Sequence, residues 1–115
     1  MLDIIHGMGC HIDYFNIRLQ REIDQWPEGI RAAYRSIVVR MVEHGPHLGL
    51  PHTRAMGGGL FEIRAQGREG IGRALFCTVA GGRVVVVHVF IKKSPRTPKA
   101  DLQLARKRLQ EVRNG

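Results

Sequence analysis

The sequence is poor in aromatic residues and in cysteine. Phe, Trp and Tyr make up 6% of the 115 residues, so a broad surface of aromatic side chains that stack on the bases of single-stranded nucleic acid is not expected. The two cysteines, Cys10 and Cys77, lie far apart and form no Cys-x-x-Cys motif. Cys77 falls within a predicted strand, where a reduced and half-buried thiol is expected.

Long hydrophobic runs are also missing. No stretch approaches the roughly 18 apolar residues of a membrane span. The N-terminus has no basic segment followed by an apolar stretch, as a secretory signal would. We therefore expect a cytoplasmic protein with no membrane partner.

The sequence has no clear motif for a metal or a cofactor, and we expect neither. His44, His47 and His52 are irregularly spaced in a segment rich in Gly and Pro, with no cysteine pair nearby, which does not indicate a metal site. Gly57-Gly58-Gly59 is not followed by Gly-Lys-Ser/Thr, so it is not a phosphate-binding loop. These glycines are expected to let the chain turn sharply into a strand.

Acidic residues are scarce at the end of the chain. The formal net charge is +8, and residues 83–115 carry nine basic against two acidic residues, whereas residues 1–58 carry six of each. A local positive field of this kind favours nucleic acid or an acidic protein partner. With so few aromatic residues, contacts to phosphates are expected to dominate over contacts to bases.

Spacing of apolar residues predicts three helices. A stripe at intervals of four and three predicts a first helix, formed by Ile12, Phe15, Leu19, Ile23 and Trp26. A second helix follows Pro27, carries apolar residues from Ile30 to Val42 and ends at His44-Gly45-Pro46. Residues 45–59 are interpreted as a loop. The last helix is expected to open at Thr97-Pro98 and to turn four residues inward, namely Leu102, Ala105, Leu109 and Val112.

Three β-rich segments are predicted to form an antiparallel meander. They are Leu60–Gln66, Ile71–Val79 and Arg83–Lys93, joined by a turn at residues 67–70 and by a Gly81-Gly82 hairpin. Turns centred there place Phe61 opposite Phe76 and Ile63 opposite Ala74, and Val87 and Val89 are expected to continue this apolar face.

The predicted order is a short N-terminal strand at Leu2–Ile5, two helices, the three-stranded meander and a C-terminal helix. This is an α+β fold with helices on one face of a curved sheet, and residues 1–115 are expected to form a single domain. The last helix either packs on the sheet or docks loosely and is displaceable.

The opposite face of the predicted meander collects cationic side chains. Arg64 lies beside Arg73, with His88, Phe90 and Lys92 on the same side. Two arginines directly opposite each other repel, so a bound anion is one reason to keep them there. Nearby cations, Lys93, Arg96 and Lys99, make a polyanion the natural candidate. In the alternative interpretation, one arginine pairs with Glu62 and the other points to solvent.

Several of these segments together resemble the RelE/HigB superfamily of bacterial type II toxins, and more narrowly its phage-derived, HigB-like branch. The resemblance covers roughly residues 27–113. It is carried by Gly-Leu-Phe-Glu-Ile-Arg at 59–64, Arg-Ala-Leu-Phe at 73–76 and His-Val-Phe-Ile-Lys-Lys-Ser-Pro-Arg-Thr-Pro at 88–98. No tyrosine follows the last strand, so the catalytic phenol of some relatives has no counterpart here.

The resemblance implies a RelE-like toxin domain that cleaves messenger RNA on the translating ribosome without a metal and halts growth. It also implies a helix-turn-helix antitoxin that binds the toxin in a hetero-oligomer. Arg64, Arg73 and Lys92 would be catalytic, with five further residues in substrate binding, namely Lys93, Arg96, Lys99, Phe90 and His88. Arg73 would stabilise the developing phosphorane charge, and Arg64 would hold the flanking phosphate.

Lys92 is the first candidate for the general base, because neighbouring cations lower the pKa of a lysine. His88 is its rival, and the alternative interpretation of that residue, a satisfied core histidine, is preferred over a catalytic role. Three functions stay open at this point. They are a ribosome-dependent endoribonuclease, a ParE-like topoisomerase poison without RNase activity, and a non-enzymatic nucleic-acid or antitoxin-like binding module.

Overall fold

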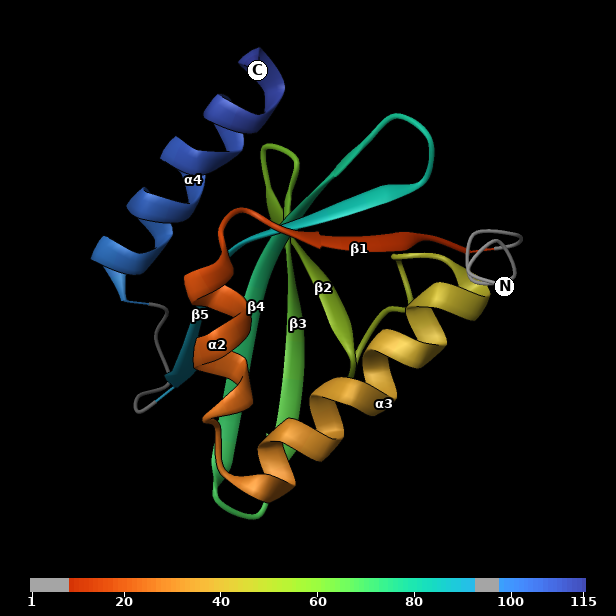
Figure 1. Cartoon of the computed structure of the whole chain (residues 1–115), viewed down its shortest axis with the longest axis vertical. Helices are drawn as coiled ribbons and strands as arrows, with labels where there is room; N and C mark the ends of the chain where they lie inside the picture. The colour runs from red at the N-terminus through yellow and green to blue at the C-terminus, as the bar shows by residue number, and fades with distance from the viewer. Residues whose placement is uncertain (1–8, 93–97) are drawn as a thin grey trace.

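The computed structural model describes residues 9–92 and 98–115. Within them, five strands form one sheet in the order β1-β5-β4-β3-β2 (Figure 1). The strands are β1 (His11–Tyr14), β2 (Thr53–Gly57), β3 (Leu60–Gly67), β4 (Gly70–Val79) and β5 (Arg83–Lys92). The helices are α2 (Ile17–Asp24), α3 (Glu28–His44) and α4 (Lys99–Asn114). The predicted α+β class is therefore confirmed, and the sheet is larger than expected.

The prediction that the first helix includes Ile12 and Phe15 is wrong. Residues 11–14 form β1, which pairs parallel with the start of β5, with His11 opposite Arg83. The helix begins only at Ile17, after Asn16, whose side chain accepts a hydrogen bond from the Leu19 backbone nitrogen at 3.2 Å. A side-chain oxygen at this position stabilises the first turn and favours a helix start there. The strand predicted at Leu2–Ile5 lies outside the described residues.

The second predicted helix is confirmed as α3. It begins directly after Pro27 and ends at His44, with Gly45 in a left-handed conformation at φ 98°. Its buried side chains recur at helical spacing and are Ile30, Tyr34, Ile37 and Met41. This one apolar side places α3 against the sheet.

The predicted loop at 45–59 contains a strand instead. Thr53–Gly57 forms β2 and pairs antiparallel with β3, with Arg54 opposite Glu62. The reversal occurs at Gly58 and Gly59, which adopt positive φ angles of 63° and 86° that favour glycine. The pairing continues past β2, since the Arg64 backbone nitrogen donates to the His52 carbonyl at 2.8 Å. Only five residues long and bulged, β2 has no clear alternation of apolar and polar residues.

The meander and most of its register are confirmed. Phe61 lies opposite Phe76, Ile63 opposite Ala74, and Arg64 opposite Arg73. On the next strand, Phe90 lies opposite Arg73 and Val89 opposite Ala74.

Val87 is the exception in this register. The pairing shifts between Leu75 and Phe76, so that Leu75 faces His88 whereas Phe76 faces Val86. This bulge leaves Val87 as an extra residue and turns it to the opposite face of the sheet, where it joins a different hydrophobic cluster. The expectation that Val87 continues the Phe76 face is therefore wrong.

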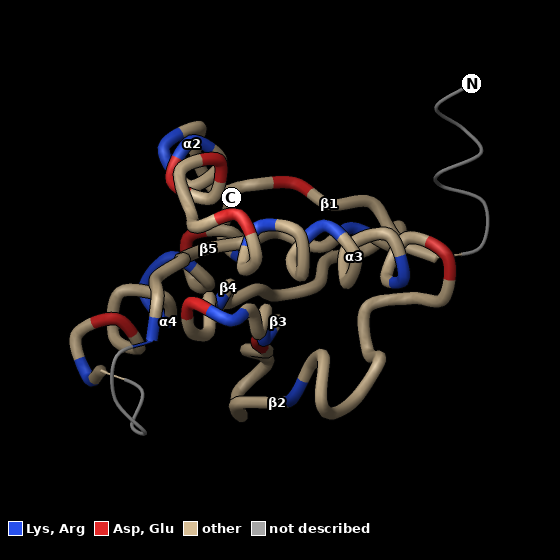
Figure 2. Tube along the Cα trace, turned by 90° about the horizontal axis from the view of Figure 1, so that it is seen from below, with Lys and Arg blue, Asp and Glu red and all other residues tan. Residues whose placement is uncertain are grey.

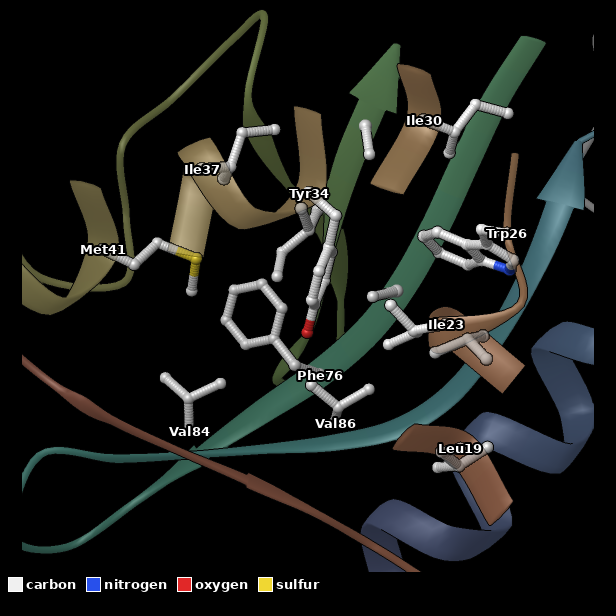
Figure 3. Close-up of a cluster of buried hydrophobic side chains, with 14 of the residues drawn as sticks. Leu19, Ile23, Trp26, Ile30, Tyr34, Ile37, Met41, Phe76, Val84 and Val86 are labelled. Carbon is white, nitrogen blue, oxygen red and sulfur yellow. The ribbon is translucent and has the colours of Figure 1, made fainter. Parts of the chain in front are cut away.

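Helices cover both faces of the sheet, which corrects the one-face arrangement. Side chains of α2 and α3 pack on one face around Phe76 and Val86, as Figure 3 shows, and the edge of the Trp26 ring meets the Tyr34 ring with centroids 5.8 Å apart. On the other face, Ala105 and Leu109 of α4 form a second cluster with residues of β3, β4 and β5, namely Leu60, Leu75, Cys77, Val85 and Val87. In Figures 1 and 2, α3 and α4 accordingly lie on opposite sides of the strands.

The last helix thus packs on the sheet, with Leu102 and Val112 also partly buried against it. It begins at Lys99, one residue later than predicted, and Thr97 lies outside the described residues. Within residues 9–92 and 98–115, no helix combines the length and apolar character that crossing a membrane requires.

Candidate nucleic-acid interface

The face of the sheet that carries α4 also carries a cluster of three arginines around one carboxylate, which we call the Glu62 cluster (Arg54, Glu62, Arg64 and Arg73). Glu62 Oε1 lies 2.6 Å from Arg54 Nε and 3.4 Å from Arg64 Nε. Its second oxygen, Oε2, lies 3.0 Å from Arg73 Nη1. Three neighbouring strands, β2, β3 and β4, therefore each contribute one guanidinium to a single carboxylate.

The strand register explains this convergence. Arg54 on β2 lies directly opposite Glu62 on β3, and Arg64 follows Glu62 by two positions, so its side chain points to the same face. Arg73 on β4 lies opposite Arg64. The alternative expectation was that one arginine pairs with Glu62 and the other points to solvent. The pairing is present, but neither Arg64 nor Arg73 simply points to solvent, because both contact this carboxylate.

Burial divides the cluster into an inner and an outer part. The side chains of Glu62 and Arg73 are 0% exposed, whereas those of Arg64 and Arg54 are 24% and 41% exposed. Burial lowers the pKa of Arg73, the Glu62 carboxylate opposes this change, and Arg54 and Arg64 add to it. A buried guanidinium needs a partner of this kind, since an unpaired charge away from water is very costly.

Lys92, the last residue of β5, adds a fourth cation near the cluster. Its pKa is lowered from the usual lysine value, first by desolvation and then by the positive charges of Arg73 and Arg64. The direction agrees with the expectation that crowding by cations would lower it. Figure 2 shows the basic positions of β2, β3 and β4 along the chain trace.

His88 is tied to α4 instead of being open to solvent. Its Nε2 lies 2.5 Å from Asp101 Oδ1 in the first turn of α4, and its side chain is 14% exposed. The His88 and Phe90 rings stack at 5.8 Å. Nδ1 of His88 is buried and has no hydrogen-bond partner in the described part of the chain. This environment fits the interpretation of His88 as a core histidine better than that of an accessible base.

The structure therefore brings together Arg64, Arg73, Lys92, His88 and Phe90 on one face. Lys99 is exposed at the start of α4, and Lys93 and Arg96 lie outside the described residues. The catalytic and binding roles of all eight residues stay predictions.

Sequence reasoning missed Arg54 as a member of the cluster and Asp101 as the partner of His88. Arg54 was assigned to a loop, and only its pairing opposite Glu62 reveals its position. Asp101 carried a weaker signal, since an acid in the first turn of a helix is favourable and common.

Two basic residues of α4 hold the helix in place. Arg106 donates to the carbonyl oxygens of Met56 and Gly57 at 3.1 and 3.0 Å, at the end of β2. Arg108 donates to the Val87 carbonyl at 2.8 Å, and its guanidinium lies 5.1 Å from the centre of the Phe15 ring. The side chains of Arg106 and Arg108 therefore anchor α4 to the sheet, whereas those of Lys107 and Arg113 are exposed.

A small pocket of about 180 Å³ adjoins the cluster at Arg64. It is lined by seven residues from α3, β3 and the segment before β2, namely Ala33, Ser36, Ile37, Pro51, His52, Arg64 and Gln66. Two of the three loop histidines have other neighbours: the His47 ring lies 4.5 Å from the Phe61 ring, and His52 Nε2 lies 3.4 Å from Arg40 Nη1.

Comparison with known proteins identifies a family for this chain. No curated protein matches it. Among protein families, residues 21–110 match the family described as phage derived protein Gp49-like. The match extends from α2 into α4 and contains the whole Glu62 cluster and Lys92. The chain therefore belongs to the Gp49-like family of phage-derived proteins, which is a family of RelE/HigB-like toxins.

Proposed function

We propose that this protein is the toxin of a type II toxin–antitoxin system and that it cleaves messenger RNA on the translating ribosome, thereby halting growth. The observation that carries this proposal is the excess of cations on one sheet face, where Glu62 is the acid shared by three arginines and Lys92 lies nearby. Membership of a toxin family supports the same function.

The proposed reaction is attack of an RNA 2′-OH on the adjacent phosphate, without a metal. The bond from phosphorus to the 5′-oxygen of the next nucleotide breaks, which leaves a 2′,3′-cyclic phosphate and a 5′-hydroxyl that takes its proton from water. Negative charge develops on the phosphorane, and fixed cations that meet this charge lower the barrier. Arg64, with a partly exposed guanidinium, is assigned direct contact with the phosphate. Arg73 is fully buried, so it is assigned electrostatic support from beneath Arg64.

Lys92 is proposed as the general base that takes the proton from the 2′-OH. A base must be neutral to accept a proton, and a lowered pKa gives Lys92 a larger neutral fraction at a given pH. His88 is the less suitable base because its Nε2 is engaged with Asp101.

A helix-turn-helix antitoxin is the proposed partner of the toxin in a hetero-oligomer. The family supports a toxin–antitoxin context. Exposed cations on α4, at Lys107 and Arg113, suit an acidic segment of such a protein or ribosomal RNA.

A ParE-like topoisomerase poison is the second candidate. The observation that favours it is the complete burial of Arg73 and Glu62, because a buried ion pair also serves a toxin scaffold that has no RNase activity.

Mapping of RNA 5′ ends in a translating bacterial extract tests the proposal. We would compare the wild type with Arg64→Gln and with Arg35→Gln, which removes an exposed arginine from α3 on the other face of the sheet. New cuts within open reading frames are expected for the wild type and Arg35→Gln and are lost in Arg64→Gln. Intact messages from a wild-type protein that still arrests growth overturn the proposal, and inhibition of DNA supercoiling would then support the second candidate.

A further inference from the structure

We propose that Arg54 and Arg64 together bind one phosphate group of the RNA backbone, and that Glu62 is the positioning residue for both. This site deepens the proposed function and rests on it for the identity of the ligand as RNA. Arg54 comes from β2, a strand that the sequence did not predict, and it is not among the predicted site residues.

The geometry brings the two guanidiniums to one point. Arg54 Nε and Arg64 Nε both contact the same carboxylate oxygen, Glu62 Oε1, at 2.6 and 3.4 Å. Both contacts are made through Nε, and a guanidinium has five N–H donors in a planar fork. The terminal nitrogens of both arginines form no hydrogen bond within residues 9–92 and 98–115 that would engage them elsewhere. They are the donors that suit a phosphate oxygen.

Burial determines which members of the cluster a ligand can reach. Arg54 and Arg64 are 41% and 24% exposed, whereas Glu62 is fully buried. A phosphate that approaches from solvent therefore meets two guanidiniums and does not meet the carboxylate directly. This arrangement differs from a surface salt bridge, in which the acid and the base are equally open to the ligand.

The charges of the cluster do not cancel. Three arginines contact Glu62, and in the described part of the chain no other acid forms an ion pair with Arg54 or Arg64. The two partly exposed guanidiniums, Arg54 and Arg64, share this one carboxylate, which also contacts Arg73, so Glu62 does not neutralise both of them. A phosphodiester supplies negative charge and accepts hydrogen bonds, so it can engage the terminal N–H groups of both arginines while their Nε atoms stay beside Glu62 Oε1.

Glu62 has a geometric role besides its charge. Without the carboxylate, Arg54 and Arg64 repel each other and lose the atom that holds both Nε groups on the same side. A positioning role therefore predicts that Glu62→Gln weakens RNA binding although it makes the protein more positive. If Glu62 acts only through its negative charge, Glu62→Gln should instead bind RNA more tightly. The two roles therefore predict changes in RNA affinity of opposite sign.

The experiment measures binding of a 2′-O-methyl RNA oligonucleotide, which lacks the attacking hydroxyl, at several salt concentrations. Each phosphate contact to single-stranded nucleic acid contributes about 0.7 to the slope of log K against log salt. Arg54→Gln is expected to lower the slope by about this amount and to weaken binding about tenfold. Arg54→Lys keeps the charge but loses the fork, so it is expected to weaken binding with little change in slope. Arg35→Gln is the matched control and is expected to bind as the wild type does.

Several results would overturn the site. The first is an unchanged affinity and salt slope in Arg54→Gln. The second is tighter RNA binding by Glu62→Gln, provided that this variant shows a cooperative thermal unfolding transition. The third is failure of the wild type to bind the oligonucleotide at low salt. The Arg54 variants keep the test valid if Glu62→Gln does not fold, because Arg54 is partly exposed.

This experiment separates the site from the proposed function. Wild-type protein that binds the oligonucleotide through Arg54 but leaves messages intact in the extract supports the site and overturns the enzyme. Cleavage that depends on Arg64, together with unchanged binding by Arg54→Gln, overturns the site and leaves the function in place.

Discussion

Glu69, in the turn between β3 and β4, caps helix α3 from 40 residues away: its Oε2 accepts a hydrogen bond from the Gly29 backbone nitrogen at 3.1 Å. Pro27, at the N-cap of α3, provides no side-chain hydrogen bond, so the hairpin turn supplies one for the helix. Unsatisfied N–H groups of the first turn, together with the helix dipole, favour a negative charge there.

This contact predicts a pH-dependent stability. Hydrogen bonds from the backbone, first that of Gly29, lower the pKa of Glu69. Its stabilisation is therefore present above the unfolded-state pKa of about 4.3 and is lost as the pH falls through the lower folded-state value. We expect Glu69→Gln to melt below the wild type at neutral pH, with the difference shrinking in acid. Thermal unfolding between pH 2 and 7 checks this, with Glu22→Gln on α2 as the control; a difference that grows in acid contradicts it.

Gly72 allows α3 to approach β4 closely. A Cβ atom at this position would lie 2.6 Å from both Ile30 Cγ2 and Trp26 Cζ3. Gly72→Ala is therefore expected to destabilise the protein by about 1–3 kcal/mol through overpacking. Urea unfolding measures this effect, and Thr78→Ser at an exposed position of the same strand is the control. Equal midpoints for Gly72→Ala and the wild type would show that the helix moves freely away.

The Glu62 cluster predicts an asymmetry between its two buried members. Glu62→Ala leaves the buried Arg73 without its carboxylate, and breaking a buried pair in this way costs about 3–5 kcal/mol. Arg73→Met leaves Glu62 with Arg54 and Arg64, so its cost is expected to be smaller. Urea unfolding of the two variants compares their free energies. Equal or reversed losses would show that Arg54 and Arg64 do not stabilise the carboxylate.

Lys92 as general base predicts a rate that rises with pH. The neutral amine is the active form, so cleavage is expected to increase up to a pKa that lies below the usual lysine value of about 10.4. Lys92→Arg keeps the charge but cannot serve as a base, and it is expected to lose this rise while still binding RNA. Single-turnover cleavage against pH measures both. A wild-type pH profile in Lys92→Arg removes the assignment.

The His88–Asp101 pair predicts a structural effect at α4. Asp101→Asn is expected to loosen the first turn of the helix by about 1 kcal/mol, seen as faster amide hydrogen exchange there. The pH profile of cleavage is expected to stay unchanged, because Lys92 is assigned the proton transfer. A shift of the pH profile of cleavage in Asp101→Asn would instead indicate that His88 is the general base.

The elements that could be predicted are those with a strong local signal. Helix α3 has a long apolar stripe, and the meander has a Gly81-Gly82 turn that sets the pairing of its strands. Counting residues from the turns was enough to place Arg64 opposite Arg73.

The elements that were missed are too short to give a clear local pattern. β1 has four residues and pairs with a strand about seventy positions later, and β2 has only five residues and is bulged. Arg54 could not be predicted as a member of the cluster without β2, because its pairing with β3 is what places it opposite Glu62. The depth of Arg73 was also hidden, because alternation along a strand gives the face of a side chain and not its burial.

The bulge at Val87 separates an apolar first half of β5, which packs against α4, from a second half that carries polar side chains on the same face. Val85 and Val87 contact α4 on one face of the sheet, and the very next residue, His88, begins the polar row on that same face. A regular strand would alternate through this point and turn His88, Phe90 and Lys92 toward α3, into the apolar core. A single extra residue thus sets the phase of the strand and places Lys92 on the same face as the arginines of the three neighbouring strands.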